Sequence, residues 1–491
     1  MSCGKLQNKD CRFVKERNGL LMALLFKFLS QASFTCITSV VILSPWVFSA
    51  WEMWFFWPFV VLIFISLLFF SLKLVLSAWS DEPVSNRGKL KIVVVMSWLI
   101  FLAYAFARFA QADVYMDAER SFLLFLTPFL LGIQIVFGFD RNQSKILWKI
   151  MLVNLFSLGL YGVINHLGWK SSHVLWRPGY AQYVAESRAT GTYFCPDHFS
   201  GIMELALSLA LGVLLARGED VRQKIFSLVI VLVSLVGIVL SKSRGGGLTI
   251  IFLGAVVLAI GFMQWPVIVR WYLRATIAGA AGLILIFFCN YESSYMVRFK
   301  EHFGWNQLRG KPTSEILVGA KSRLVASCRG QMYSAALRAW KDKPLFGIGP
   351  GMHQNLWPHY APSPDGDREL GVWPSFPNYE FHSYEVHSDW IQLLEEYGTV
   401  GLVLFVLLFG IILCVLFKGM MGEVAARQDV DSMLTGNGHY AMILGAIFSC
   451  AVMAFHSFGD FNLQMPATVW LMAAIVAVPV GYIVNSESLR S

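Results

Sequence analysis

A histidine in the last third of the chain has the setting of a general base. His387 precedes a segment whose apolar residues recur at helical spacing as far as Tyr397. We therefore expect a short amphipathic helix to begin near Ser388, with Asp389 in its first turn, where backbone N–H groups are unpaired. An imidazole can accept a proton near neutral pH. This segment thus offers proton transfer at the mouth of a helix, although a lone loop histidine can equally be structural.

Two other segments offer cations suited to an anionic ligand. The sequence Ser241-Lys-Ser-Arg-Gly-Gly-Gly247 predicts a tight turn in which Lys242 and Arg244 supply charge and the glycines expose backbone N–H groups. Arg329 lies in a predicted amphipathic helix over residues 324–340, expected against the membrane surface. A guanidinium group is planar, permanently charged and able to grip phosphate oxygens with two hydrogen bonds. Each arginine also has an ordinary structural explanation, as an interfacial anchor or a solvated helix residue.

Two further polar segments border predicted membrane spans. One runs from Arg188 to His198, and the other from His456 to Pro466 with Asp460 inside it. A metal site is a weak alternative, because the nearby histidines of the insert lack ligand spacing; these are His353, His359, His382 and His387. The eight cysteines show no metal spacing either, and whether Cys195 and Cys328 pair stays open.

The elements that must position these residues are membrane helices. Of the 491 residues, 56% are hydrophobic and only 14% charged, and the mean hydropathy is +0.58. A soluble domain carries about 25% charged residues. The net charge of +8 is no argument for a nucleic-acid partner, since membrane proteins gather Lys and Arg on cytoplasmic loops.

The hydropathy pattern predicts an all-α polytopic protein. Stretches of about 20 apolar residues give twelve spans, at 28–50, 54–79, 92–110, 121–139, 146–167, 198–216, 225–240, 247–264, 275–290, 398–417, 439–456 and 467–484. The expected organisation is a cytoplasmic tail (1–27), nine spans (28–290), a large periplasmic loop with amphipathic helices (291–397), and three spans with a short cytoplasmic C-terminus (398–491).

Loop charges orient these spans. Basic residues gather on alternate short loops, which the positive-inside rule places in the cytoplasm; examples are Arg87, Lys89, Arg141, Lys145, Arg217, Arg222, Arg270 and Lys418. Both termini are then inside, and His387, Arg244, Arg329, Arg188 and Asp460 fall on the outer face. Such a site has no access to cytoplasmic nucleotide sugars, so a transfer reaction there needs an energised donor already carried across the membrane.

Taken together and in this order, the five segments resemble the O-antigen ligase and polysaccharide polymerase superfamily. The family pattern runs as R-x-x-G-T-(F/Y)-x-x-P, S-R-G-(G/A), R with a downstream P-x-x-G-x-G, H-N-D-x-L-Q-x-x-x-E-x-G and D-F-x-L-x-x-P, and the chain matches it from about Arg188 to its C-terminus. One departure is Ser388, which stands where the family usually has Asn. The resemblance implies a GT-C-like glycosyltransferase in the bacterial inner membrane with a periplasmic active site.

The resemblance also implies roles for individual residues. The donor would be a glycan on undecaprenyl diphosphate, and the acceptor a sugar hydroxyl of lipid A core or of another glycan. Arg244 and Arg329 would hold the diphosphate and His387 would deprotonate the acceptor, without metal or other cofactor and with inversion at the anomeric carbon. Arg188, Lys242, Asp389 and Asp460 would bind substrate, with Asp389 orienting His387.

Two alternatives remain open at this point. A polymerase of the same superfamily would share every motif and differ in its acceptor. A polysaccharide transporter would also have about twelve spans, but it predicts charges near span centres and related halves, and we see neither pattern clearly.

Overall fold

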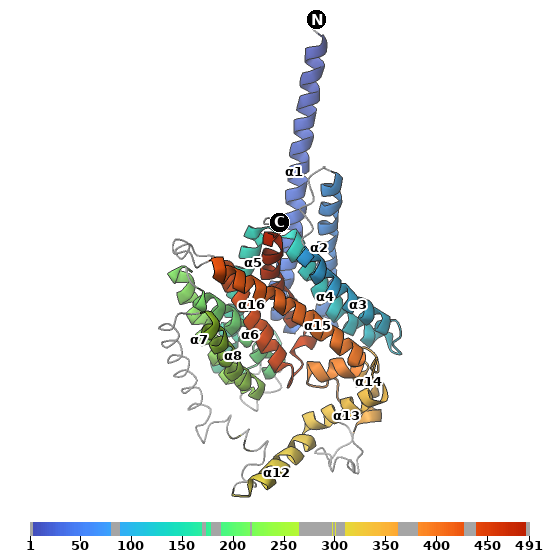
Figure 1. The fold of residues 1–491 in the computed structure, drawn as a ribbon, viewed down its shortest axis with the longest axis vertical. Helices are drawn as coiled ribbons and strands as arrows, with labels where there is room; N and C mark the ends of the chain where they lie inside the picture. The colour runs from blue at the N-terminus through green and yellow to red at the C-terminus, as the bar shows by residue number, and fades with distance from the viewer. Residues whose placement is uncertain are drawn as a thin grey trace.

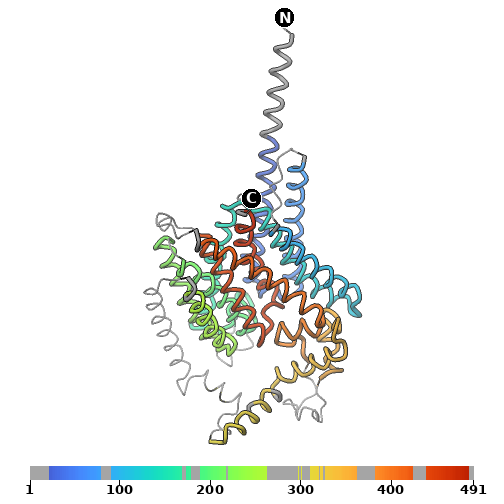
Figure 2. Tube along the Cα trace, viewed as in Figure 1, coloured from blue at the N-terminus to red at the C-terminus, as the bar shows by residue number. Residues whose placement is uncertain are grey.

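The computed structural model describes residues 3–79, 89–168, 173–177, 188–216, 219–264, 297, 300, 310–361, 382–426 and 438–487 (Figures 1 and 2). Regular structure within these ranges is helical, apart from one isolated bridge between Val174 and Arg177. The first half contains α1 (Cys3–Leu43), α2 (Met53–Trp79), α3 (Lys89–Phe109), α4 (Tyr115–Gly138), α5 (Arg141–Gly168), α6 (Pro196–Leu215), α7 (Val221–Ser241) and α8 (Arg244–Gln264). The second half contains α12 (Thr313–Ala326), α13 (Cys328–Asp342), α14 (His353–Tyr360), α15 (Asp389–Ala426), α16 (Gly438–His456) and α17 (Pro466–Glu487).

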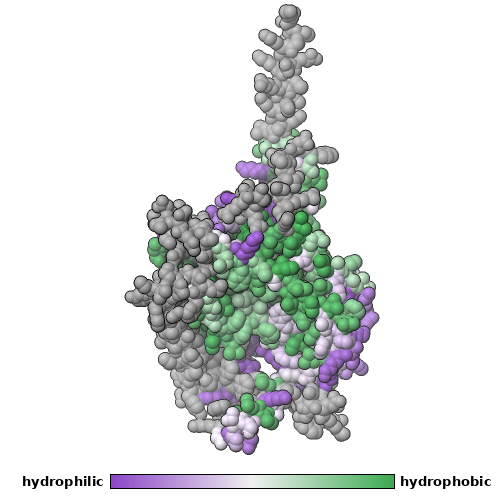
Figure 3. Space-filling model, viewed as in Figure 1, coloured by the Kyte–Doolittle hydropathy of each residue, from purple (hydrophilic) through white to green (hydrophobic). Residues whose placement is uncertain are grey.

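Eleven helices in the described ranges are long and apolar enough to cross a membrane. Each coincides with one of the spans predicted from hydropathy, and the remaining predicted span, 275–290, lies outside the described residues. Apolar side chains cover much of the helical body (Figure 3), and some point outward, such as Leu68 and Leu407, which are 57% and 58% exposed. The chain is therefore a multi-pass membrane protein, while the count of twelve spans and the GT-C-like topology stay predictions.

The boundary predicted at residue 27 is not the end of an element. Helix α1 begins at Cys3 and continues without interruption through the apolar stretch that starts at Leu21. In Figure 1, α1 projects beyond the bundle at the end where α17 also finishes, and α12–α14 lie at the opposite end. Helices α12–α14 and the end of α17 are thus at opposite ends of the bundle, and the membrane sides predicted for the termini and the insert stay predictions.

The centre of the bundle is formed by α6, α16 and α17, which are buried along most of their length. Helix α6 makes its most extensive contacts with α16, and α17 packs on α4. Small residues permit the close approach of α6 and α16, because a Cβ atom at Gly212 would lie 2.5 Å from the carbonyl oxygen of Ala441. This central pair carries polar residues from both halves of the chain to one end of the bundle.

The helix predicted over residues 324–340 is two helices. Ser327 is extended and caps α13, accepting a hydrogen bond from the N–H of Gly330, so α12 ends one residue earlier. The apolar face of α13 is also not left for the membrane, because Met332 and Ala335 pack against Trp357 of α14. Arg329 consequently lies in the first turn of α13.

Helix α15 combines the predicted amphipathic helix and the predicted tenth span. It begins at Asp389 and bends at Gly398, where φ is +69°. The bend leaves carbonyl groups of the preceding turn open, and the N–H groups of Ile348 and Gly349 donate to the carbonyls of Glu395 and Glu396. The glycine-containing segment after α13 is thereby joined to the segment that carries His387.

Alanine at Gly398 is expected to lower stability by about 1–3 kcal/mol, because an L-residue is strained at this φ. In addition, its Cβ atom would lie 2.3 Å from the carbonyl oxygen of Leu345. Thermal unfolding of the detergent-purified protein measures the effect. Gly410→Ala is the matched control on the same helix, where a Cβ atom meets nothing within 4 Å. Equal melting temperatures for the two variants would contradict this account of the bend.

Candidate active site

Asp460 is the centre of a polar cluster at the end of α16. Its side chain is 1% exposed. Four side chains from four segments approach its carboxylate within 4 Å: His387 Nδ1 at 3.5 Å, His198 Nε2 at 3.7 Å, Arg329 Nη2 at 3.8 Å and His456 Nε2 at 3.9 Å. We name these five residues the Asp460 cluster. It unites α6, α13, the start of α15 and the end of α16.

The surroundings keep Asp460 ionised. Burial alone raises the pKa of this carboxyl, but contact with His387 and the positive charge of Arg329 outweigh burial and hold the pKa well below its ordinary value. Asp460 also accepts a hydrogen bond from the N–H of Phe461. A fixed negative charge therefore lies beside Nδ1 of His387.

Arg329 joins Asp460 to a second carboxylate. Its Nη2 lies 3.6 Å from Asp197 Oδ2, at the start of α6. Asp197 Oδ1 is 2.8 Å from Nη2 of Arg188, whose Nε donates to the carbonyl of Ser241. The side chain of Arg188 is 5% exposed, whereas that of Arg329 is 31% exposed. Arg329 can therefore present N–H groups to a ligand, while Arg188 connects α6 to the end of α7.

His387 has a strained backbone that aims its ring. Its φ is +60°, in the left-handed region that a non-glycine residue rarely occupies. The hydroxyl of Tyr333 donates a hydrogen bond to the carbonyl oxygen of His387 at 2.9 Å. The imidazole ring of His387 packs edge-on against the ring of Phe461. Nδ1 is buried toward Asp460, yet the side chain as a whole is 30% exposed. The accessible part of the imidazole is therefore on the side away from Asp460.

The role expected for Asp389 in orienting His387 is not what the structure shows. Asp389 Oδ2 accepts hydrogen bonds from the hydroxyl of Ser457 and from the N–H of Leu463. The carboxylate recorded within 4 Å of His387 Nδ1 is that of Asp460. Asp389 is 8% exposed and ties α15 to the loop after α16.

Ser388, which replaces the family's usual Asn, also has a structural role. Its hydroxyl donates to the carbonyl of Ser457 at 3.0 Å and lies 3.4 Å from the N–H of Ile391, as a helix N-cap does. The residue is fully buried. In this chain, therefore, position 388 caps α15 and does not reach the surface of the site.

The turn between α7 and α8 lies beside the Asp460 cluster. Lys242 is left-handed, with φ +50°, and Arg244 begins α8. A Cβ atom at Gly245 would lie 2.7 Å from His456 Nε2, and one at Gly246 would lie 2.0 Å from Ser200 Oγ. The backbone N–H groups that the sequence predicts for binding an anion are only partly available, because those of Gly246 and Gly247 donate hydrogen bonds to Ser243. These glycines allow the first turn of α8 to pack closely against α6 and α16.

Several residues of this site received no individual role from the sequence, although three of the four lie in the two polar segments that border predicted spans. They are Asp197, His198, Glu204 and His456, the last two joined by a 2.8 Å contact between Nδ1 and Oε1. Glu204 carried a usable signal, since an ionisable residue within a span is a functional candidate by default. Its partner, 252 residues away, carried none that spacing could reveal. The thiols of Cys195 and Cys328 are both free.

A second polar group lies behind the start of α15. His353 contacts Glu395 at 2.8 Å and Ser383 at 3.1 Å, while the Gln392 amide donates to Glu385 and Glu396. Burial raises the pKa of Glu385, and the amide of Gln392 together with the charge of Arg120 opposes that rise. These contacts brace the His387 segment. Within the described part of the chain, no group of three or more His, Cys, Asp or Glu residues is placed to hold a metal.

Comparison with protein families supports the motif resemblance. A family model described as O-Antigen ligase matches residues 229–406, and a search of curated proteins found no match. The matched segment contains Lys242, Arg244, Arg329, His387 and Asp389, and it confirms the resemblance seen in the motifs. Arg188 and Asp460 lie outside it and are joined to it by the contacts described above.

Proposed function

From the premise that residues 229–406 belong to the O-antigen ligase family, we propose that this protein transfers a glycan from undecaprenyl diphosphate to a sugar hydroxyl. The reaction would take place at the periplasmic face of the bacterial inner membrane, with both termini in the cytoplasm. The observation that supports this most directly is the Asp460 cluster, in which a partly exposed guanidinium and a partly exposed imidazole share one buried carboxylate.

His387 acts as the general base in this proposal. Because Nδ1 faces Asp460, that nitrogen holds the ring proton and Nε2 accepts the proton of the acceptor hydroxyl. The acceptor oxygen then forms a bond to the anomeric carbon as the bond from that carbon to the diphosphate oxygen breaks. Attack from the face opposite the leaving group inverts the configuration.

The leaving undecaprenyl diphosphate gains negative charge that the protein must stabilise. Arg329 supplies a guanidinium beside the base, and Lys242 and Arg244 supply cations at the turn next to His456. Arg188, Asp460 and Asp389 are buried, so we assign them to positioning: Arg188 holds Asp197, Asp460 orients His387 and Arg329, and Asp389 fixes the start of α15.

Transfer is expected to be unchanged in EDTA, because fixed guanidinium groups take the place of a divalent cation in this scheme. The measurement uses purified protein in nanodiscs with a carrier-linked glycan, and follows the glycosylated acceptor with and without chelator. Loss of transfer in EDTA that added Mg²⁺ reverses would contradict the proposal. A magnesium-dependent control transferase should lose its activity in the same EDTA buffer, which shows that chelation is complete.

A ligase, which we favour, and a polymerase differ in the acceptor that receives the glycan. The lipid and polysaccharide profile of a deletion strain separates the two. Free lipid A core with long carrier-linked chains supports the ligase, whereas single capped repeat units support the polymerase. A normal profile for both products would contradict the proposed function.

A further inference from the structure

Two cavities meet beside His387. The first is polar, with a volume of about 520 Å³, and His387, Phe461, Trp51, Arg120 and Glu385 are among the residues that line it. The second is apolar, with a volume of about 210 Å³, and it lies between α3, α4, α15, α16 and α17. Residues that line both are Ser121, Leu124, Gln392, Glu396 and Gln464. The two cavities therefore adjoin along these residues.

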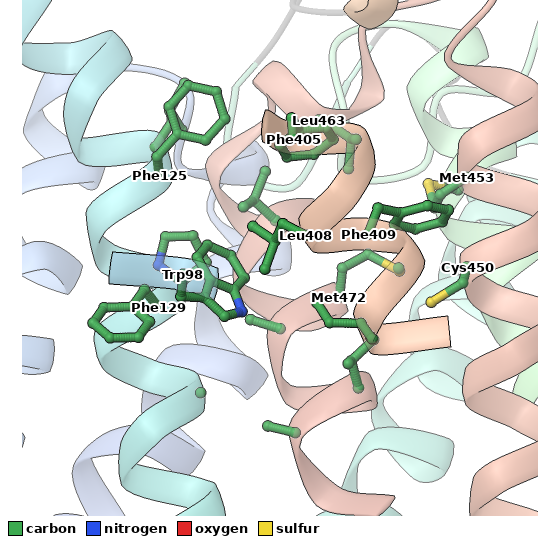
Figure 4. A pocket seen from close by; sticks show the side chains of 18 of the residues that line it. Trp98, Phe125, Phe129, Phe405, Leu408, Phe409, Cys450, Met453, Leu463 and Met472 are labelled. Carbon is green, nitrogen blue, oxygen red and sulfur yellow. The ribbon is translucent and has the colours of Figure 1, made fainter. Parts of the chain in front are cut away.

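The apolar cavity has the character of a lipid-chain site. In Figure 4, Trp98 of α3 and Phe129 of α4 lie opposite side chains of α15 and α17, such as Phe409 and Met472. Phe137, also in its wall, is 37% exposed. An alkyl chain could enter from the membrane and remain in apolar contact along its length.

The polar cavity suits sugar hydroxyls better than a diphosphate. Its walls carry the carboxylates of Glu385, Glu396 and Asp117 against the single guanidinium of Arg120. The aromatic residues Trp51 and Phe461 also line this cavity, and the guanidinium of Arg120 lies over the Trp51 ring, 4.1 Å from its centroid. Arg120 is the only arginine or lysine among the residues that line this cavity, so a diphosphate would find a single cation here.

The cations assigned to the diphosphate lie elsewhere. The residues that line the two cavities do not include Arg188, Lys242, Arg244 or Arg329. Arg188 precedes α6, and Lys242 and Arg244 lie where α7 ends and α8 begins. Arg329 lies at the start of α13. His387 is thus between the cavities on one side and the cations on the other.

We propose that the two adjoining cavities together form the acceptor subsite, which takes a glycolipid with its alkyl chain between α3, α4, α15 and α17 and its sugar beside Glu385 and Arg120. This inference rests on the proposed role of His387, to which the sugar presents one hydroxyl. The donor's lipid chain is then held on the other side of His387. Glu385 and Arg120 become residues that read the acceptor sugar.

Photolabelling tests the subsite without turnover. The probes are a decyl glucoside with a diazirine in its alkyl chain and the same chain with a diphosphate head, applied to the full protein in nanodiscs. We expect the glucoside to label peptides of α3, α4, α15 and α17, and to label His387→Ala equally, so that failure of the base and failure of the subsite are distinguishable. Preferential labelling of these helices by the diphosphate probe would assign the cavity to the donor and overturn the proposal.

Gly132→Phe closes the apolar cavity from within. Gly132 is in its wall, and a Cβ atom there meets only Ala477, at an ordinary 3.9 Å. Glucoside labelling should fall about tenfold or more, whereas Gly254→Phe on α8, with nothing within 4 Å of its Cβ, should label as the parent does. Glu385→Gln, which leaves the apolar wall intact, should weaken labelling by the glucoside and spare a decyl chain without a sugar. Unchanged glucoside labelling in both Gly132→Phe and Glu385→Gln would refute the acceptor subsite.

Discussion

Arg329→Met is expected to lower the rate of glycan transfer by about 10²–10³-fold, the loss typical when a preorganised charge beside a developing anion is removed. It should also destabilise the protein, since Asp197 and Asp460 would remain close together without the cation between them. Loss of one partner of a buried ion pair costs about 3–5 kcal/mol, and we expect the lower end because the arginine is 31% exposed.

The two effects of Arg329→Met can be separated. Adding Asp460→Asn removes one of the stranded charges and should restore part of the melting temperature while transfer stays lost. Lys341→Met is the matched control, because Lys341 is exposed on the same helix. The measurements are thermal unfolding in detergent and single-turnover transfer in nanodiscs. Transfer at the parent rate in Arg329→Met would remove this residue from the site.

His387→Ala is expected to lower kcat by about 10²–10⁴-fold, the usual contribution of a general base. Stability should change little, because the side chain is 30% exposed and its Nδ1 makes no hydrogen bond within the described residues. Binding of the carrier-linked donor should also persist, since Arg329 and the α7–α8 turn remain.

A matched histidine substitution makes this result specific. His359 is exposed on α14 in the same insert and lies outside both cavities and the Asp460 cluster. His359→Ala should therefore transfer glycan as the parent does. If His387→Ala also keeps full activity with saturating acceptor, another group must take the proton.

Much of the membrane architecture could be predicted from the sequence, because a span is a local feature. Eleven predicted spans coincide with helices, and the short amphipathic helix before Gly398 begins where Ser388 caps it. The non-helical backbone at Gly398 separates these two segments of α15 at the boundary between the predicted amphipathic helix and the predicted span. The break at Ser327 also had a local signal, a serine that can cap the next helix, which the longer apolar periodicity outweighed.

The partners within the site could not be predicted in the same way. The resemblance implies that Asp389 orients His387, but Asp389 accepts hydrogen bonds from Ser457 and Leu463, and the carboxylate beside His387 Nδ1 is that of Asp460. The contact between Glu204 and His456 depends on how α6 packs against α16. Spacing along the chain holds no information about such pairings, whereas residue type did indicate Arg329 and His387.

The anomeric configuration of the bond formed by the purified protein tests the central claim most directly. Direct attack by a hydroxyl that His387 deprotonates predicts a single product with the configuration opposite to that of the lipid-diphosphate donor, as read by NMR of the glycosylated acceptor. A product that retains the donor's configuration, or no glycan transfer from the lipid diphosphate, would contradict it.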